Sequence, residues 1–383
     1  MFGYAVVCAM FMKVPLRIIF NLRRFMNLKK TALAIVMLGL IVIAYFSFKI
    51  YAIMLVPNTA FNSKEAYIFI STGATYSDVR SDIKPLLLDI EKFDALAKQK
   101  KYNINVKAGR YRIAKDMTNN DIINSLRSQN LAVTVTFNNQ NSLGLLAQRI
   151  SNQVEADSLS LMGVFTDSLF LSSNAFSKES ALAMYLPNTY EFFWNTSAKK
   201  IRSKLQKAYN IFWSSNRKQK AKAMGLTPVE VSILAAIVQE ESKELTEQPR
   251  IAGVYMNRLK NNWALQADPT LKFAAYQTKA YKNKVIKRVL NKHKKIESPY
   301  NTYMHTGLPP GLIAMPDLSA IDAVLNFESH SYFYFAADPS RPGFHRFAKT
   351  LYAHNANARR YQNYLNRQGI RLSLIHISEP TRP

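Results

Sequence analysis

Glu241 is the residue in this sequence whose surroundings best suit acid–base chemistry. It lies in the run Leu226 to Glu244, LTPVEVSILAAIVQEESKE, which we predict to be a helix. The positions three, four and seven residues before it are Val238, Ile237 and Leu234. Because these positions share a helix face, the carboxyl group would end an apolar stripe. A carboxylic acid in such surroundings keeps its proton to higher pH, as a general acid must.

The neighbouring Glu240 is the alternative acid. It lies one position round the same predicted helix, and the residues behind it include Ile233 and Ile237 but also Glu230. That stripe is more polar, so we expect Glu241 rather than Glu240 to face inward. A solvated helix end rich in glutamate is the competing interpretation of both residues.

The helix that carries Glu241 has a clear start in the sequence. The Thr227 hydroxyl can cap it, and Pro228 suits its first position. Glu230 stands three residues after Thr227 and completes a capping box.

The composition limits the classes of protein to be considered. The chain has 383 residues, of which 48% are hydrophobic and 20% charged, so it is neither disordered nor wholly embedded in a membrane. Its 51 basic and 25 acidic residues suggest a polyanionic neighbour, but they form no nucleic-acid motif. The lone Cys8 excludes an internal disulfide and a cysteine metal cluster, and no HExxH pattern or phosphate-binding loop occurs.

A long apolar stretch near the N-terminus predicts a membrane anchor. Residues Thr31 to Val56 are long enough to cross a bilayer, and Lys29 and Lys30 before them favour a cytoplasmic N-terminus. A cleaved signal peptide is the alternative. We expect the natural start at Met26, with 26–56 as cytoplasmic tip and anchor and 1–25 as upstream translation or a cytoplasmic leader.

The rest of the chain alternates between strand and helix patterns and predicts an α+β fold. Short strands at Tyr67–Ile70, 107–113 and Ala132–Phe137, with capped helices between them, predict a small α+β module over 57–137. Residues 138–225 read as a connecting helical region, in which the aromatic run 185–194 would suit a domain junction or a groove rim. A mixed α+β domain follows over 226–371, and 372–383 matches no element and reads as an artefactual tail.

Seven short motifs occur in one order along the chain: AAIVQEES, GVYMNRL, LQADPT, SPYNTY, GLPPG, YFYFAAD and HRF. Together they resemble the YceG-like endolytic murein transglycosylases (MltG), over nearly all of Tyr67 to Arg371. Members of that family commonly show an I-V-E-K-E pattern. The matching residues here run from Ile237 to Glu241, so the second glutamate of the pattern is retained at Glu241.

The resemblance implies a function as well as a fold. It implies a LysM-like first module, a catalytic domain over 226–371, and Glu241 as the acid that cleaves the MurNAc–GlcNAc β-1,4 bond of nascent glycan to leave 1,6-anhydro ends and terminate elongation. It implies no cofactor or metal, and as partners peptidoglycan strands, the inner membrane and peptidoglycan synthases. The candidate substrate-binding residues are Asn257, Arg258, Gln266, Asp268, Tyr300, Asn301, Thr302, His345 and Asn355.

Two other function classes remain open at this stage. A non-catalytic, membrane-anchored wall-binding protein could use the LysM-like module and the basic surface. A DNA-binding role is disfavoured by the predicted anchor.

Overall fold

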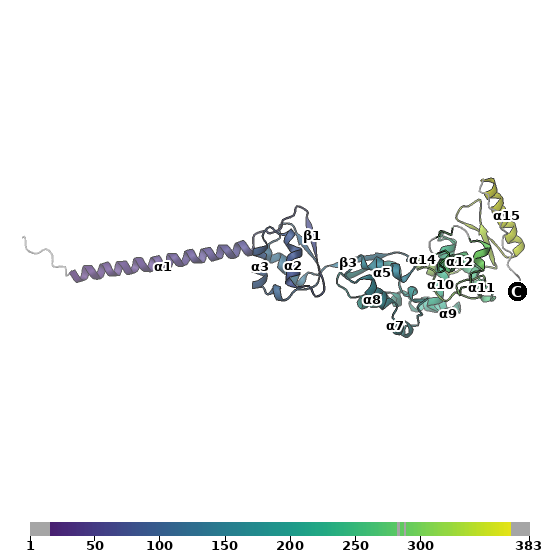
Figure 1. Cartoon of the computed structure of the whole chain (residues 1–383), viewed down its shortest axis with the longest axis horizontal. Coiled ribbons are helices and arrows are strands. Elements are labelled where there is room, and N and C mark those ends of the chain that lie inside the picture. Colours follow the sequence, from purple (N-terminus) through teal and green to yellow (C-terminus); the bar gives the residue numbers. More distant parts are fainter. Residues whose placement is uncertain (1–15, 282–283, 287–288, 369–383) are drawn as a thin grey trace, which may run out of the picture. The chain divides into compact units, whose positions relative to one another are not determined.

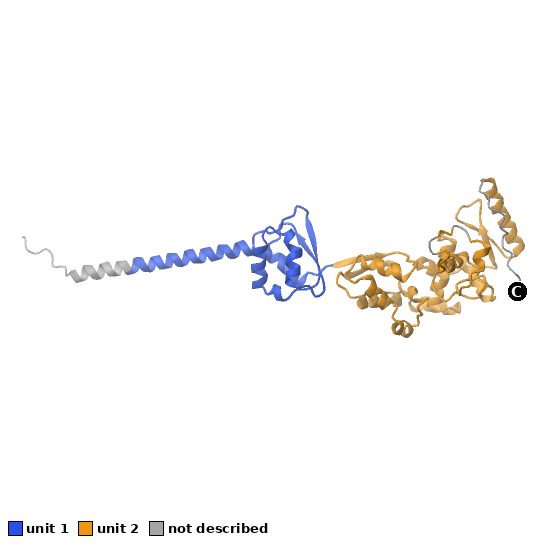
Figure 2. Cartoon of the chain, in the orientation of Figure 1, with its two compact units in different colours: residues 1–131 blue, residues 132–383 orange. Residues whose placement is uncertain are grey.

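The computed structural model describes residues 16–281, 284–286 and 289–368, with side chains from Leu28 onward. Two compact units make up the chain, Met1–Leu131 and Ala132–Pro383 (Figure 2). Our expectations for residues 1–15 and for the tail from Leu372 lie outside the described residues.

The predicted apolar segment forms helix α1 (Leu16–Met54) at the start of the first unit (Figure 1). Its part Leu28–Met54 has 27 residues and is long and apolar enough to cross a membrane. At 1.5 Å per residue it is about 40 Å long, against about 30 Å of bilayer hydrocarbon. Large apolar side chains such as Ile35 and Phe48 are exposed on it, which is compatible with membrane anchoring.

The rest of the first unit is built on a two-stranded antiparallel sheet of β1 and β2, in which Tyr67 pairs with Arg112. The helices that we expected to be capped begin at Thr75 and Thr118, each of which forms a capping box. Helices cover the apolar face of the sheet, and residues such as Phe93 are fully buried between them. The elements are β1 (Glu65–Ile70), α2 (Tyr76–Ile83), η1 (Lys84–Leu86), α3 (Ile90–Gln99), η2 (Tyr102–Ile104), β2 (Gly109–Ala114) and α4 (Asn119–Ser128).

The second unit begins with strand β3 (Ala132–Phe137), which we expected within the first module. It pairs instead with β4 (Asn188–Phe193), and Val135 lies opposite Tyr190. The aromatic run that we expected at a junction or groove rim therefore supplies a strand. The helices of this part are α5 (Leu143–Ser151), α6 (Ser158–Phe165), α7 (Ser168–Ser173), η3 (Ala181–Met184), α8 (Ala198–Phe212) and α9 (Ser215–Ala223).

Helix α10 (Pro228–Glu241) lies at the centre of this unit, and its capping box between Thr227 and Glu230 is confirmed. Every residue from Val231 to Gln239 is buried, including Ile233 and Ala236 behind Glu240. The predicted contrast between the two stripes therefore rests on Glu230 at the helix start, because neighbours cover both stripes along the shaft.

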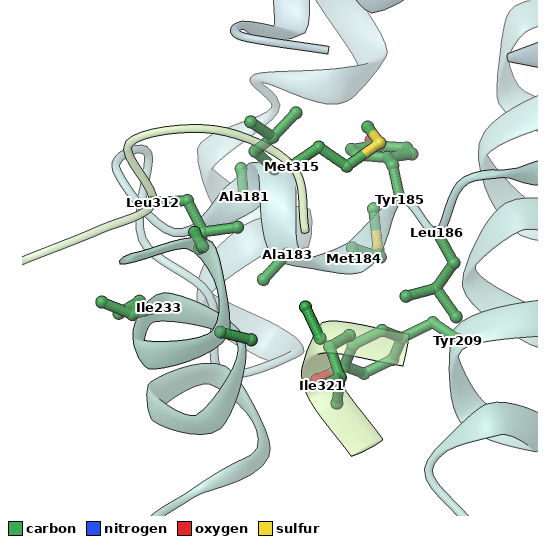
Figure 3. Packing of buried hydrophobic residues seen from close by; sticks show 14 of the residues in the cluster. Ala181, Ala183, Met184, Tyr185, Leu186, Tyr209, Ile233, Leu312, Met315 and Ile321 are labelled. Carbon is green, nitrogen blue, oxygen red and sulfur yellow. The ribbon is translucent and has the colours of Figure 1, made fainter. Parts of the chain in front are cut away.

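The packing round α10 explains why its whole shaft is apolar. Figure 3 shows Ile233 of this helix among Met184, Tyr209, Leu312 and Ile321, which come from four other segments of the chain. The regions 138–225 and 226–371, which the sequence separated, thus share one hydrophobic core. Only the two ends of the helix reach the surface.

The elements after α10 gather round its C-terminal end. Helix α10 contacts α11, α12 and α14, and a hairpin of β5 and β6 is covered by α15. We did not predict helix α14 or strand β6 from the sequence. The bounds are α11 (Gln248–Lys260), α12 (Asp268–Tyr276), α13 (Asn291–Lys294), α14 (Leu318–Leu325), β5 (Tyr334–Ala337), β6 (His345–Ala348) and α15 (Leu351–Arg367).

Two helical glycines provide a matched test of this packing. A Cβ atom added to Gly253 on α11 would lie 2.2 Å from the carbonyl oxygen of Glu328. We expect Gly253→Ala to lower the free energy of unfolding by about 1–3 kcal/mol, more than the helix-propensity gain of up to about 1 kcal/mol. Gly163→Ala on α6 meets no heavy atom within 4 Å and should be neutral or stabilising. Urea melts of both variants test this, and destabilisation of equal size in both would contradict it.

Candidate active site

Glu241 is the last residue of α10, where the buried helix reaches the surface. Its side chain is half-buried, whereas Glu240 is exposed and forms an ion pair of 2.8 Å with Lys243. The prediction that Glu241 faces inward and Glu240 outward is therefore confirmed.

A buried tyrosine on the next helix holds the Glu241 carboxyl group. The Tyr255 hydroxyl donates a hydrogen bond of 2.8 Å to Glu241 Oε1. Tyr255 is only 1% exposed, so its hydroxyl group needs a partner inside the protein. This bond fixes one of the two carboxyl oxygens.

Arg258, one helical turn after Tyr255, ties three segments together at the site. Its Nε donates to the Phe333 carbonyl at 2.9 Å, and an Nη donates to the Leu265 carbonyl. The guanidinium group lies near the rings of Trp263 and Tyr334. Because it is 7% exposed, Arg258 acts mainly as a buried clamp between α11, the turn before α12 and the start of β5.

The LQADPT turn brings a second carboxylate to the site. Gln266 adopts a left-handed conformation with φ of 48°, and its N–H donates to the Thr302 carbonyl at 2.9 Å. This turn leads into α12, whose first residue is Asp268. The Tyr303 hydroxyl donates to Asp268 Oδ1 at 2.8 Å, so this carboxylate is already engaged by a phenol.

Burial raises the pKa of Glu241 to about 7, and the negative charge of Asp268 acts in the same direction. The Tyr255 hydrogen bond and the charges of His345 and Arg258 partly oppose this shift. Near neutral pH a large fraction of Glu241 is therefore protonated. It can both give and take a proton, as a group that serves first as acid and then as base requires.

Two cavities meet at Glu241, and it lines both of them. One, of about 390 Å³, is lined on its other sides by Gly343 to His345 and by two aromatic residues of α15, Tyr361 and Tyr364. The other, of about 190 Å³, is enclosed by residues from α11, α12, β5, α15 and the 303 loop: Arg258, Gln266, Asp268, Tyr303, Tyr334, Phe335 and His354. A ligand longer than either cavity could thus pass over the carboxyl group.

His345 is held beside the larger of these two cavities by a buried glutamate. Its main-chain N–H donates to Glu247 Oε1 at 2.8 Å, and its Nδ1 lies 2.7 Å from Glu247 Oε2.

Within the described part of the chain, no group of three or more His, Cys, Asp and Glu residues could hold a metal ion.

A model of the YceG-like family matches residues 68–360. The chain belongs to the YceG-like family. Its curated relatives include the endolytic murein transglycosylase of Bacillus subtilis strain 168, which is 30% identical over 319 residues covering 77% of this chain and 84% of the relative. The endolytic murein transglycosylase of Streptococcus pneumoniae R6 is 25% identical over 346 residues, covering 81% of this chain and 60% of the relative.

A crystal structure of a YceG-like protein from Listeria monocytogenes supports the fold of this YceG-like chain. The two chains are 24% identical, with a TM-score of 0.50, and the alignment covers 77% of this chain and 99% of that one. The similarity concerns the fold alone.

Four of the predicted substrate-binding residues line the cavities at Glu241. Arg258, Gln266 and Asp268 line the smaller one, and His345 lines the larger one. Each comes from a different turn or element, so only the folded YceG-like domain brings them together.

Other predicted substrate-binding residues have contacts that stabilise the scaffold. Asn257 donates to the carbonyls of His330 and Tyr332, and Asn301 donates to the carbonyls of Lys294 and Ile296.

The remaining predicted residues line neither of the two cavities at Glu241. The Thr302 hydroxyl accepts the Ala267 N–H at 3.0 Å, and Tyr300 packs on Phe273. Asn355 is half-buried on α15, next to the cavity-lining His354.

Tyr255, Tyr303 and His354 also belong to the site, although we did not predict them from the sequence. A usable signal existed for Tyr255, because it precedes Arg258 by three residues and so shares its helix face. Tyr303 and His354 come from a loop and from the last helix, and no spacing in the sequence relates them to Glu241.

Two nearly isosteric variants should move the pKa of Glu241 in opposite directions. Tyr255→Phe removes a donor that favours the carboxylate, so the pKa should rise by about one unit. Asp268→Asn removes a negative charge that disfavours the carboxylate, so the pKa should fall by about one unit. Carboxyl ¹³C titration of glutamate-labelled protein measures both shifts.

The spectrum of Glu241→Gln identifies the resonance of Glu241 in this titration by its loss. Shifts of the same sign in the two variants would show that the cited contacts do not control the ionisation.

Proposed function

We propose that this YceG-like protein is an endolytic murein transglycosylase. It cleaves the β-1,4 bond between MurNAc and GlcNAc within nascent glycan strands and leaves 1,6-anhydro-MurNAc ends, which terminates elongation. The observation that carries the proposal is the position of Glu241, a carboxyl group with a pKa of about 7 where two cavities meet. Relatives named endolytic murein transglycosylase support it independently.

One titrating carboxyl group is sufficient for this reaction. Protonated Glu241 donates its proton to the glycosidic oxygen as the bond from C1 of MurNAc to that oxygen breaks. The C6 hydroxyl oxygen of the same sugar then bonds to C1, and its proton passes to the Glu241 carboxylate. The 1,6-anhydro ring closes, the acid is regenerated, and no water is consumed.

Hydrolysis is the chemical alternative, and it requires a second carboxylate that activates water. Asp268 is the nearby candidate, but it accepts the Tyr303 hydroxyl at 2.8 Å. We assign Asp268 to raising the pKa of Glu241 and to positioning Tyr303. The products separate the two mechanisms, because hydrolysis leaves reducing MurNAc ends in place of anhydro ends.

Cleavage inside a strand requires room for sugars on both sides of the scissile bond. The cavities of about 390 and 190 Å³ that meet at Glu241 support this mode. We assign sugar contacts in the smaller cavity to Arg258, Gln266 and Asp268. In the larger cavity we assign them to His345 and to the exposed faces of aromatic side chains, which suit sugar rings.

The first unit would bring the enzyme to its substrate. Its β1-α2-α3-β2 order, with antiparallel strands, supports a LysM-like glycan-binding role. Helix α1 would cross the inner membrane once with its N-terminus in the cytoplasm, since Lys29 and Lys30 precede the apolar span. The domains would then lie outside the cytoplasm beside nascent glycan and the penicillin-binding synthases that make it.

Glu241→Gln keeps the side-chain size and removes the titrating proton. We expect folding to survive and the rate of anhydro-end formation to fall by ~10²–10⁴-fold, the range attributed to acid–base catalysis. Glu240→Gln is the matched control, because Glu240 lines neither of the two cavities at Glu241 and is paired with Lys243, and its effect should be small. Digestion of purified glycan strands, mass analysis of the ends and thermal melts provide the measurement.

Two outcomes of this comparison count against the assignment of Glu241. Inactivity of Glu240→Gln alone would mean that the neighbouring residue is the acid. Full activity of both variants would remove the catalytic role and favour a wall-binding protein.

The proposed orientation predicts where the C-terminal part of the protein lies. A reporter that works only outside the cytoplasm, fused after Leu365, should be active, because the positive charges precede α1. Reversing Lys29 and Lys30 to glutamate should reduce that activity. Activity of a cytoplasm-only reporter at the same position in the unmodified chain would refute the orientation.

A further inference from the structure

A third cavity, of about 710 Å³, opens beside the Glu240 side of the α10 end. Glu240 forms part of its lining, and α12 contributes one wall through Lys272, Phe273 and Tyr276. Lys272 and Tyr276 are four residues apart and so share a face of that helix. Lys279 lines the cavity just beyond the end of α12.

Another part of the lining consists of Ile313, which belongs to the hydrophobic core, its buried neighbour Ala314 and the exposed Asn141. The adjacent Met315 N–H donates to the Gln140 carbonyl at 2.9 Å, and the Asn139 side chain donates to the Met315 carbonyl at 3.1 Å. These bonds hold together two segments that are distant in sequence and fix this part of the lining.

The cavity carries an excess of positive charge. Its one acidic residue, Glu240, is paired with Lys243. Within the described part of the chain, Lys272 and Lys279 form no ion pair with a carboxylate. The sequence from 269 to 296 contains no Asp or Glu at all. Two uncompensated ammonium groups in a concave, partly aromatic site favour a ligand with carboxylates.

We infer that this cavity receives the acidic stem peptide carried by the muramic residue at the cleavage site, an inference that rests on the proposed function. Glu240 and Pro269 line this cavity, and their chain neighbours Glu241 and Asp268 line the smaller cavity at the candidate acid, so the two cavities lie on neighbouring residues of α10 and of the start of α12. The muramic residue at that bond carries its peptide on a lactyl group at C3. The free carboxylates of the peptide meet Lys272 and Lys279, and its apolar parts meet Phe273 and Tyr276.

This placement has a consequence for substrate choice. A stem peptide in the cavity would hold the muramic sugar in one orientation over Glu241 and would favour strands that still carry peptides over denuded strands. Because the contacts are between charges at a partly exposed site, the preference should weaken as the salt concentration rises.

A binding measurement tests the cavity independently of turnover. The full-length Glu241→Gln protein in detergent is titrated by calorimetry with a soluble muramoyl pentapeptide. Adding Lys272→Gln and Lys279→Gln should weaken binding about fivefold or more, from two lost ion pairs. Adding Lys218→Gln and Lys222→Gln on α9 instead makes the same change in net charge away from the cavity and should leave binding unchanged.

A cleavage measurement then uses proteins with Glu241 intact. The ratio of anhydro-end formation on peptide-bearing and on denuded strands should fall about fivefold in the Lys272→Gln, Lys279→Gln protein and stay constant in the Lys218→Gln, Lys222→Gln protein. Equal affinities and equal ratios in all these proteins would overturn the stem-peptide site. Binding of a soluble polyphosphate at this cavity that the muramoyl peptide does not displace would also overturn the stem-peptide site. The ligand would then be an anionic polymer.

Failure of the proposed function gives a different result. In that case neither strand type yields anhydro ends, while the charge-dependent binding of the muramoyl pentapeptide persists. Anhydro ends with no charge-dependent preference would instead leave the transglycosylase activity standing and remove the stem-peptide site.

Discussion

The burial of one helix controls the chemistry of this protein. Helix α10 is covered on all sides from Val231 to Gln239, so its end must emerge at a fixed point of the second unit. Glu241 lies at that point, where burial withdraws its carboxyl group from water and the negative end of the helix dipole further disfavours the anion. The feature that stabilises the core thus also holds a proton on the acid near neutral pH.

The surrounding contacts shift the pKa of this carboxyl group in opposite directions. Tyr255 donates to it and favours the anion, whereas Asp268 disfavours the anion through its charge. Arg258 is committed largely to the carbonyls of Phe333 and Leu265, so it supports the walls of the site more than it pairs with Glu241. An ion pair with a free arginine would instead have kept the acid permanently ionised.

At the end of α10, a tightly packed residue and two residues that line cavities follow one another in the sequence. Gln239 is buried and accepts the Asp317 N–H at 2.6 Å, which links α10 to the start of α14. The family pattern has a glutamate where this chain has Gln239, and a glutamate side chain could accept the same bond. Glu240 and Glu241 are adjacent helix positions, but Glu240 lines the basic cavity and Glu241 lines the two cavities of the candidate active site.

The sequence by itself determined the features that depend only on residues close together in the chain. The capping boxes at Thr75, Thr118 and Thr227 and the apolar span of α1 follow from residues within one helical turn or one continuous run. The ordered motifs also identified the family, and they are the basis on which Glu241 is proposed as the acid. Each of these inferences rests on spacing along the chain, which one sequence contains in full.

The tertiary structure alone decided what surrounds Glu241. The sequence could not show that β3 pairs with β4, because that register depends on residues more than fifty positions apart. It could not separate Arg258, which lines a cavity, from Asn257, which supports the 330–332 segment, because adjacent helix positions face different neighbours. It also could not join Tyr303 and His354 to the acid, since chain distance carries no information on contacts made by folding.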